Sequence, residues 1–158
     1  MSHGKISKQD IFDVQKQWGN AVVNIGHDYI SKKDYVATAS SAIETLYDFD
    51  NGSVLFKPTR TMADNPFRNT KESAIAYFVG GGEYDDAGFA INPWSRVRFD
   101  ENQTILIKDD FAISMGLYYF MDANTNIETT VEFTFGYRFR DDGNLVIFLH
   151  HSSVPYSK

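Results

Sequence analysis

Hydrophobic residues along the chain change their spacing once, near residue 53. Before that point they recur every three or four positions, which is the period of an amphipathic α-helix. The first helix is expected to bury a stripe made of Ile11, Val14, Trp18, Val22, Ile25 and Tyr29. A second helix after residues 31–34 is expected to bury Tyr35, Val36, Ala39, Ala42, Ile43 and Leu46. The turn-forming run DFDNG at 48–52 ends this helical part.

From residue 53 onward the spacing approaches two, the period of a β-strand. A short strand at 54–56 stops at Pro58, and a short third helix opens near Asn69. Five further strands are expected at 89–99, 104–108, 111–121, 128–140 and 144–154. Their connections are short and rich in Asp, Asn and Gly, so most neighbouring strands should pair antiparallel.

This order of elements predicts an α+β fold, with N-terminal helices packed on a strongly curved, mostly antiparallel sheet. A chain of 158 residues is expected to form a single domain over residues 1–158. Residues 1–6 are expected to be disordered or left over from an expression vector.

Hydrophobic residues on both faces of the expected sheet point to self-assembly. In 111–121 the odd positions are apolar, yet Tyr118 and Phe120 lie on the opposite face, and 145–149 (LVIFL) is apolar on both. Three helices cover about one face, so another subunit should cover the rest. The residues expected at this interface are Leu117, Tyr119, Phe133, Phe135 and Tyr137. Alternatively, the apolar excess fills a strongly curled core within one chain.

Composition narrows the possible chemistry. The formal net charge is −6 and basic residues are scattered, which argues against a nucleic-acid partner. The chain has no cysteine, which excludes disulfides and thiolate metal sites. His150 and His151 are adjacent on a strand and point to opposite faces, so they cannot share one metal ion. We therefore expect no metal and no organic cofactor.

No apolar run approaches the roughly 20 residues needed to cross a bilayer, and no secretory signal is visible at the N-terminus. We therefore expect no membrane partner and a cytoplasmic location.

The order helix–helix–strand–helix–strands resembles the cone-shaped nuclear-transport-factor-2-like fold, also called SnoaL-like or cystatin-like. Within it, the run 142–155 (DGNLVIFLHHSSVP) is similar to the ending of the association (hub) domain of calcium/calmodulin-dependent protein kinase II and its stand-alone relatives. The stretches VLFKPT at 54–59 and FAINPWSRVRF at 89–99 are also typical of those relatives. The resemblance implies a self-assembling scaffold, a homo-oligomeric ring larger than a dimer, without catalytic residues and with a small pocket in each subunit.

The position of that pocket follows from the same resemblance. Two arginines that line it in animal hub domains fall on Gly116 and Gly136 here, and these glycines would make room on the more polar strand register. The residues expected to line the pocket or its rim are Arg96, Arg98, Tyr118, Glu132, Thr134, Arg138 and one of His150 and His151. Alternatively, the glycines relieve bending in a curved sheet, and the charged residues pair on a solvated face.

Two other functions stay open, because one fold hosts many activities. The chain would be a small enzyme of the dehydratase, isomerase or cyclase kind if a Tyr, a His and a carboxylate met in the cone. It would be a non-catalytic binder if the pocket held a small anion or an aromatic molecule. No Asp–His or paired-Asp arrangement with suitable spacing is visible. The main expectation is therefore a hub without catalytic activity.

Overall fold

Three helices form where the hydrophobic stripes predict them, in a computed structural model that describes residues 4–158. Helix α1 spans Lys8–Ile30. Ser7 caps it, because its hydroxyl accepts a hydrogen bond from the backbone N–H of Asp10 and the Asp10 carboxylate accepts one from the backbone N–H of Ser7. Helix α2 spans Tyr35–Leu46 and helix α3 spans Lys71–Val79. Within the described residues, none of the helices is long and apolar enough to cross a membrane.

Six strands form one sheet in the order β1-β6-β5-β4-β2, with β3 paired to β4 on the same side as β2. The strands are β1 Leu55–Lys57, β2 Trp94–Phe99, β3 Thr104–Ile107, β4 Ala112–Asp122, β5 Glu128–Phe139 and β6 Leu145–Ser153. All pairs are antiparallel except β1 with β6, which run parallel. The parallel pair brings the segment after β1 to the C-terminal end of the chain.

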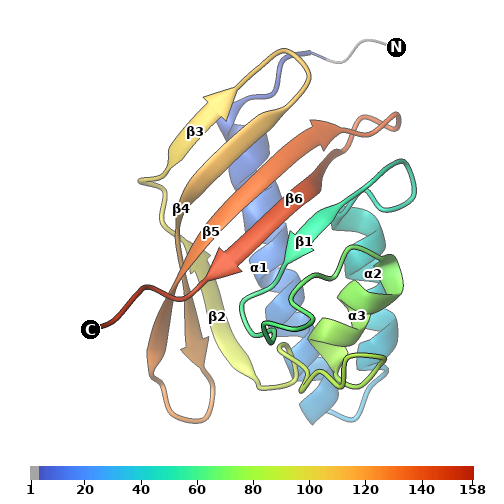
Figure 1. Ribbon diagram of the computed structural model, residues 1–158, viewed down its shortest axis with the longest axis vertical. Coiled ribbons are helices and arrows are strands. Elements are labelled where there is room, and N and C mark those ends of the chain that lie inside the picture. The colour runs from blue at the N-terminus through green and yellow to red at the C-terminus, as the bar shows by residue number, and fades with distance from the viewer. Residues whose placement is uncertain (1–3) are drawn as a thin grey trace.

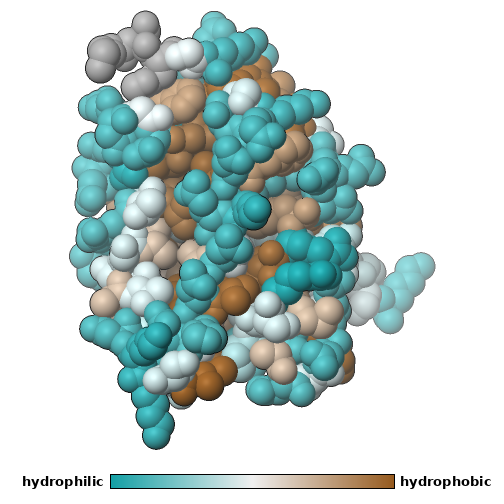
Figure 2. Space-filling view, turned by 180° about the vertical axis from the view of Figure 1, so that it is seen from behind, coloured by the Kyte–Doolittle hydropathy of each residue, from teal (hydrophilic) through white to brown (hydrophobic). Residues whose placement is uncertain are grey.

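The helices lie on one face of the curved sheet, while its other face is uncovered (Figure 1). Trp18 of α1 reaches the centre of the covered face, where its ring lies 5.6 Å from Tyr118 and 6.0 Å from Phe135. Seen from the helix side, hydrophilic side chains cover much of the surface and hydrophobic ones are visible between them (Figure 2). The helices are therefore amphipathic, with the core between them and the sheet.

A β-bulge in β6 sets which side chains face the core. Gly136 pairs with Leu149 and Tyr137 pairs with Ile147, so Phe148 is an extra residue without a partner on β5. Side chains point inward at odd positions before the bulge and at even positions after it. Gly136 faces this bulge, and a Cβ there would lie 2.9 Å from atoms of both Phe148 and Leu149.

The α+β prediction, with helices packed on a curved and mostly antiparallel sheet, is confirmed. The strand expected at 89–99 is shorter than predicted, because residues 89–93 form turns before β2. Tyr29 and Val36, expected in the buried stripes, are exposed at the ends of their helices. Ile6 is buried, and residues 1–3 of the segment expected to be disordered lie outside the described residues.

The expected subunit interface needs correction at three of its five residues. Phe133, Phe135 and Tyr137 point toward the helices and are at most 2% exposed, so they belong to the core of one chain. Leu117 and Tyr119 lie on the opposite, uncovered face and are partly exposed. The odd positions of β5 and the odd positions of β4 thus lie on different faces, since Tyr118 pairs with Val131.

Candidate functional site

Two side chains of β6 meet a tyrosine of β4 inside the core. His150 and Ser152 are two residues apart and therefore share the inward face, on which they are 2% and 1% exposed. The Tyr118 hydroxyl lies 2.6 Å from the Ser152 hydroxyl and 3.1 Å from Nε2 of His150. These three groups make a continuous hydrogen-bonded unit at the end of the sheet near β1.

Thr59 extends this unit toward solvent. It lies two residues after the end of β1, and the parallel pairing of β1 with β6 places its hydroxyl 2.6 Å from that of Ser152. Thr59 also lies close enough to the hydroxyl of Tyr77 on α3 to lower its pKa, against the larger effect of burial, and that hydroxyl accepts the backbone N–H of Arg60 at 3.0 Å. Thr59 is partly exposed, whereas Ser152, Tyr118 and Tyr77 are buried.

On its inner side, His150 is held by the helices. The Tyr47 hydroxyl lies 2.7 Å from Nδ1 of His150, and the indole N–H of Trp18 donates to Tyr47 at 2.9 Å. An indole only donates, so Trp18 takes up an acceptor site of Tyr47, and we assign the Tyr47 proton to the bond with Nδ1 and the imidazole proton of His150 to Nε2. Tyr118 then accepts from Nε2 and donates to Ser152. Every hydrogen bond from Trp18 through Tyr118 therefore points toward Ser152, and with Thr59 donating to Ser152 the Ser152 proton is left for a further acceptor.

The surroundings keep this chain uncharged. The His150 ring is stacked between Phe56, at 4.7 Å, and Phe135, at 4.0 Å. Burial, with a smaller contribution from the nearby charge of His151, holds the pKa of His150 well below its usual value. Burial likewise raises the pKa of Tyr118 and the pKa of Tyr47 above the ordinary tyrosine value. At neutral pH the site consists of a neutral imidazole and intact hydroxyls.

This arrangement presents hydrogen-bond donors that suit an oxygen atom. Across residues 4–158, no three His, Asp or Glu side chains converge in a way that could hold a metal ion. The hydroxyls of Ser152 and Thr59 end a chain of aligned donors within an aromatic environment. Such donors stabilise negative charge that develops on an oxygen atom during a reaction, because they need little reorganisation when the charge appears.

Of the residues predicted for the pocket, the structure brings only Tyr118 and His150 into this cluster. Arg96 and Arg98 lie at the exposed end of β2, where both pair with Glu128 and lower its pKa. Arg138 lies across the sheet from the cluster.

The Arg138 guanidinium pairs instead with the buried carboxylate of Asp48, at 2.6 Å. Gly116 and Gly136 open no space next to the cluster. Side chains of Gln103 and Phe133 fill the space beside Gly116, and those of Phe148 and Leu149 fill the space beside Gly136.

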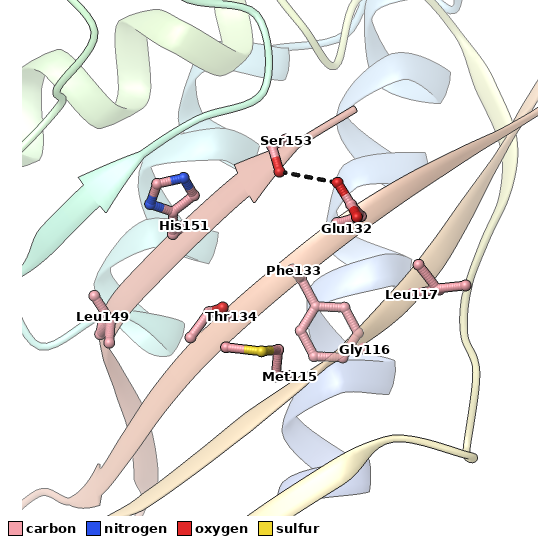
Figure 3. A pocket seen from close by; sticks show the side chains of 9 residues that line it. All are labelled: Met115, Gly116, Leu117, Glu132, Phe133, Thr134, Leu149, His151 and Ser153. Atoms are coloured by element: carbon pink, nitrogen blue, oxygen red, sulfur yellow. Dashed lines mark hydrogen bonds between the residues drawn. The ribbon is translucent and has the colours of Figure 1, made fainter. Parts of the chain in front are cut away.

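The other predicted pocket residues line a hollow on the uncovered face of the sheet (Figure 3). Its volume is about 590 Å³, and Glu132, Thr134 and His151 lie along it. Glu132 accepts a hydrogen bond from Ser153 at 3.3 Å. The sheet itself separates this hollow from Tyr118 and His150, so the residues predicted for one pocket occupy two sides of the sheet.

Sequence reasoning missed Ser152, Thr59, Tyr47, Trp18 and Tyr77. The spacing of His150 and Ser152 was a usable signal, because residues two apart on a strand share a face. Thr59 gave no local signal, since it reaches Ser152 only through the parallel pairing of two strands distant in sequence. Trp18, Tyr47 and Tyr77 could not be told apart from ordinary core residues by hydrophobic pattern.

Comparisons with known proteins agree with a catalytic site. Residues 9–154 match the family of metal-independent carbonic anhydrases. A metal-independent carbonic anhydrase from Nostoc sp. (strain PCC 7120) is 36% identical over 157 residues, covering 97% of this chain and 76% of the relative. The solved iota-carbonic anhydrase from a cyanobacterium, complexed with bicarbonate, superposes with a TM-score of 0.92 at 35% identity, covering 98% of this chain and 95% of that chain.

A more distant structure shows the wider fold. A nuclear transport factor 2-like protein from Salmonella enterica superposes with a TM-score of 0.60 at 12% identity, covering 96% of this chain and 92% of that chain. The nuclear-transport-factor-2-like fold is therefore confirmed. The identification as a kinase hub domain is wrong, and with it the expectation of a scaffold without catalytic activity, because the matches above point to an enzyme family. The chain belongs to the family of metal-independent carbonic anhydrases.

Proposed function

We propose that this chain catalyses the reversible hydration of carbon dioxide to bicarbonate and a proton. The observation that carries the proposal is the aligned hydrogen-bond chain from Trp18 through His150 to Ser152 and Thr59. The family match and the bicarbonate complex of the cyanobacterial relative support the same reaction. Of the expectations from sequence, the alternative of a small enzyme is the closer one. A tyrosine and a histidine meet in the cone, but hydroxyls of Ser152 and Thr59 stand where a carboxylate was expected.

The reaction places opposite demands on a site, since carbon dioxide is neutral and apolar while bicarbonate is an anion. The aromatic rings around His150 suit apolar carbon dioxide, and the aligned hydroxyls suit the bicarbonate anion. In the hydration direction, the Ser152 hydroxyl donates a hydrogen bond to one oxygen of carbon dioxide. This donation is strengthened by Tyr118 and His150 behind it, because hydrogen bonds in a chain polarise one another.

Thr59 orients the attacking water, since it is the partly exposed end of the chain. The water oxygen forms a bond to the carbon atom, and one C=O electron pair moves onto the oxygen held by Ser152. The proton that the water loses passes to solvent beside Thr59. The product is bicarbonate, and its negative charge faces the donors that were already aligned for it.

Two neighbouring serines of β6 provide the test of this function. Ser152→Ala removes the donor at the end of the chain and should lower kcat/KM for hydration by about 10²-fold, the usual effect of losing one such donor. Ser153→Ala is the matched control, because Ser153 lies one residue further on the opposite face of the sheet. Stopped-flow hydration with a pH indicator measures both, and oxygen-18 exchange between labelled carbon dioxide and water gives an independent rate.

Dialysis against a strong chelator tests the metal-independent part of the proposal. The wild-type rate should survive it unchanged. The proposal would be overturned by a wild type that shows no rate above the uncatalysed reaction, or by activity that chelation removes and zinc restores. Equal rates for Ser152→Ala and wild type would overturn the assigned role of the hydrogen-bond chain.

We propose in addition that the uncovered face of the sheet binds a second copy of the chain. The helices cover the opposite face, and an apolar row from β4, with Met115 at 59% exposure between Ile113 and Leu117, remains on this one. A row of this kind can pair with itself about a two-fold axis. The expected ring larger than a dimer rested on the apolar residues on both faces of 111–121 and 145–149 together with the hub resemblance, and the hub resemblance is wrong.

A further inference from the structure

An open pocket of about 360 Å³ adjoins the hydrogen-bond chain on the side of α3. Arg60, Tyr77, Phe89 and Asn92 are among its lining residues. The guanidinium of Arg60 lies over two aromatic rings, 5.6 Å from the centre of Phe89 and 5.5 Å from that of Trp94. These rings hold the cation at the pocket without neutralising it, because the attraction of a ring for a cation transfers no charge.

Arg60 differs from the other arginines in its partners. Arg68, Arg96, Arg98, Arg138 and Arg140 each pair with a carboxylate. Across residues 4–158, no ion pair is formed by Arg60. Asp86, which lies near the pocket, accepts hydrogen bonds from Nε and Nη2 of the buried Arg68. The positive charge of Arg60 is therefore free to attract an anion.

The pocket is connected to the site through shared residues. Arg60 follows Thr59 in the chain, and its backbone N–H donates to the hydroxyl of Tyr77. Thr59 lies within reach of the same hydroxyl, whose pKa it lowers against the larger effect of burial, so Tyr77 is both a wall of the pocket and a neighbour of the reacting groups. The charge of Arg60 also opposes the effect of burial on the pKa of Tyr77, which places the guanidinium within electrostatic reach of that hydroxyl.

We propose that Arg60 is a docking residue for bicarbonate, which it holds at the mouth of the site before the anion moves to Thr59 and Ser152 in the dehydration direction. This inference rests on the proposed function and adds the path of the anion. A local cation is needed there because the chain has a formal net charge of −6 and as a whole repels anions. Carbon dioxide carries no charge, so Arg60 should leave its binding unaffected.

The test compares Arg60→Gln with Arg60→Lys, and uses Arg96→Gln as a matched control on the exposed end of β2. Arg60→Gln should raise KM for bicarbonate by roughly 3- to 10-fold and leave kcat for dehydration nearly unchanged, since it removes one partly screened charge from the docking step. Arg60→Lys keeps the charge and should lie between Arg60→Gln and wild type. Arg96→Gln should match wild type.

Direct binding separates this inference from the proposed function. Titration of each variant with bicarbonate at constant ionic strength, followed by the NMR chemical shifts of the protein, gives a dissociation constant that does not depend on the rate of turnover. The dissociation constant should rise for Arg60→Gln by the same factor as KM. Unchanged binding in Arg60→Gln would overturn the docking role, as would a fall in kcat at constant KM. A wild type that binds bicarbonate through Arg60 but shows no hydration would overturn the proposed function and leave the docking site standing.

Discussion

The imidazole of His150 lies between two phenylalanine rings, and this position decides how it titrates. Protonation would place a charge between Phe56 and Phe135 with no carboxylate in the hydrogen-bonded chain to compensate it. In the unfolded chain these rings do not oppose protonation of the His150 imidazole. The unfolded state therefore binds more protons than the folded state at every pH between the lowered pKa of His150 and its ordinary value of 6.5.

The sign of the pH dependence follows from this difference. The free energy of unfolding should fall as the pH drops below 6.5, by up to about 1.4 kcal/mol per pH unit until the folded pKa is reached. His150→Gln should remove this part of the slope, and His151→Ala should keep most of it because His151 is exposed. Urea unfolding between about pH 7 and 5 measures the slopes. Parallel curves for wild type and His150→Gln would contradict the assignment.

Three carboxyl groups whose pKa is lowered contribute to the acid sensitivity below this pH window. Backbone N–H groups hold the pKa of Asp122 and the pKa of Asp142 below the usual value, and Arg98 does the same for Glu128. Their contributions to the free energy of unfolding are present above the ordinary carboxyl pKa and are lost only as the pH falls through the lowered values.

At the scale of elements, the local patterns predict helices and strands well, while contacts between distant segments escape them. The stripe from Ile11 to Ile25 predicts the buried face of α1, since that face follows from helical periodicity. The bulge at Phe148 has no such signature. Simple alternation from Leu145 and Ile147 would place His151 inside, so the sequence left open which histidine faces the core. The parallel pair β1–β6, which positions Thr59, was equally invisible because it joins segments about 90 residues apart.

Gly136 allows the bulge that orients His150 and Ser152. In Gly136→Ala the new methyl group would lie within 3 Å of the Cβ of Leu149, which cannot rotate away. The expected result is a loss of about 1–3 kcal/mol in the free energy of unfolding, together with reduced hydration activity. Thr134→Ala, two positions earlier on the same face, should change neither. Urea unfolding and stopped-flow rates test both, and a fully stable, fully active Gly136→Ala would show that the bulge tolerates a side chain.

At the scale of the whole molecule, the two faces of the sheet have different tasks. The face toward the helices holds the core and the hydrogen-bond chain, and the other carries the apolar row of β4 and the hollow beside Glu132. The sequence predicted apolar residues on both faces, and the error lay in assigning Phe133, Phe135 and Tyr137 to the outer one. Alternation alone gives two sets of residues per strand, and only the helices decide which set is inside.

Self-association through the outer face can be tested by one charge. Met115→Glu should convert a dimer into a monomer at micromolar concentration without loss of helical circular dichroism, because Met115 is exposed in the single chain. Ile30→Glu, which is 60% exposed at the end of α1, is the control on the helix side and should remain a dimer. Light scattering coupled to size-exclusion chromatography measures the mass. A monomeric wild type would contradict the proposal.

Strand β6 contains two doublets in succession, His150–His151 and Ser152–Ser153. On each face of this strand a histidine is therefore followed two positions later by a serine, His150 by Ser152 and His151 by Ser153. The bulge at Phe148 decides which of these two pairs faces the core. Loss of the bulge with Phe148 retained in regular alternation would bring His151 and Ser153 inward as a pair of the same composition. A chain that has lost His150 or Ser152 by mutation thus has a route to recovery other than reversion, through a second change on the N-terminal side of the pair.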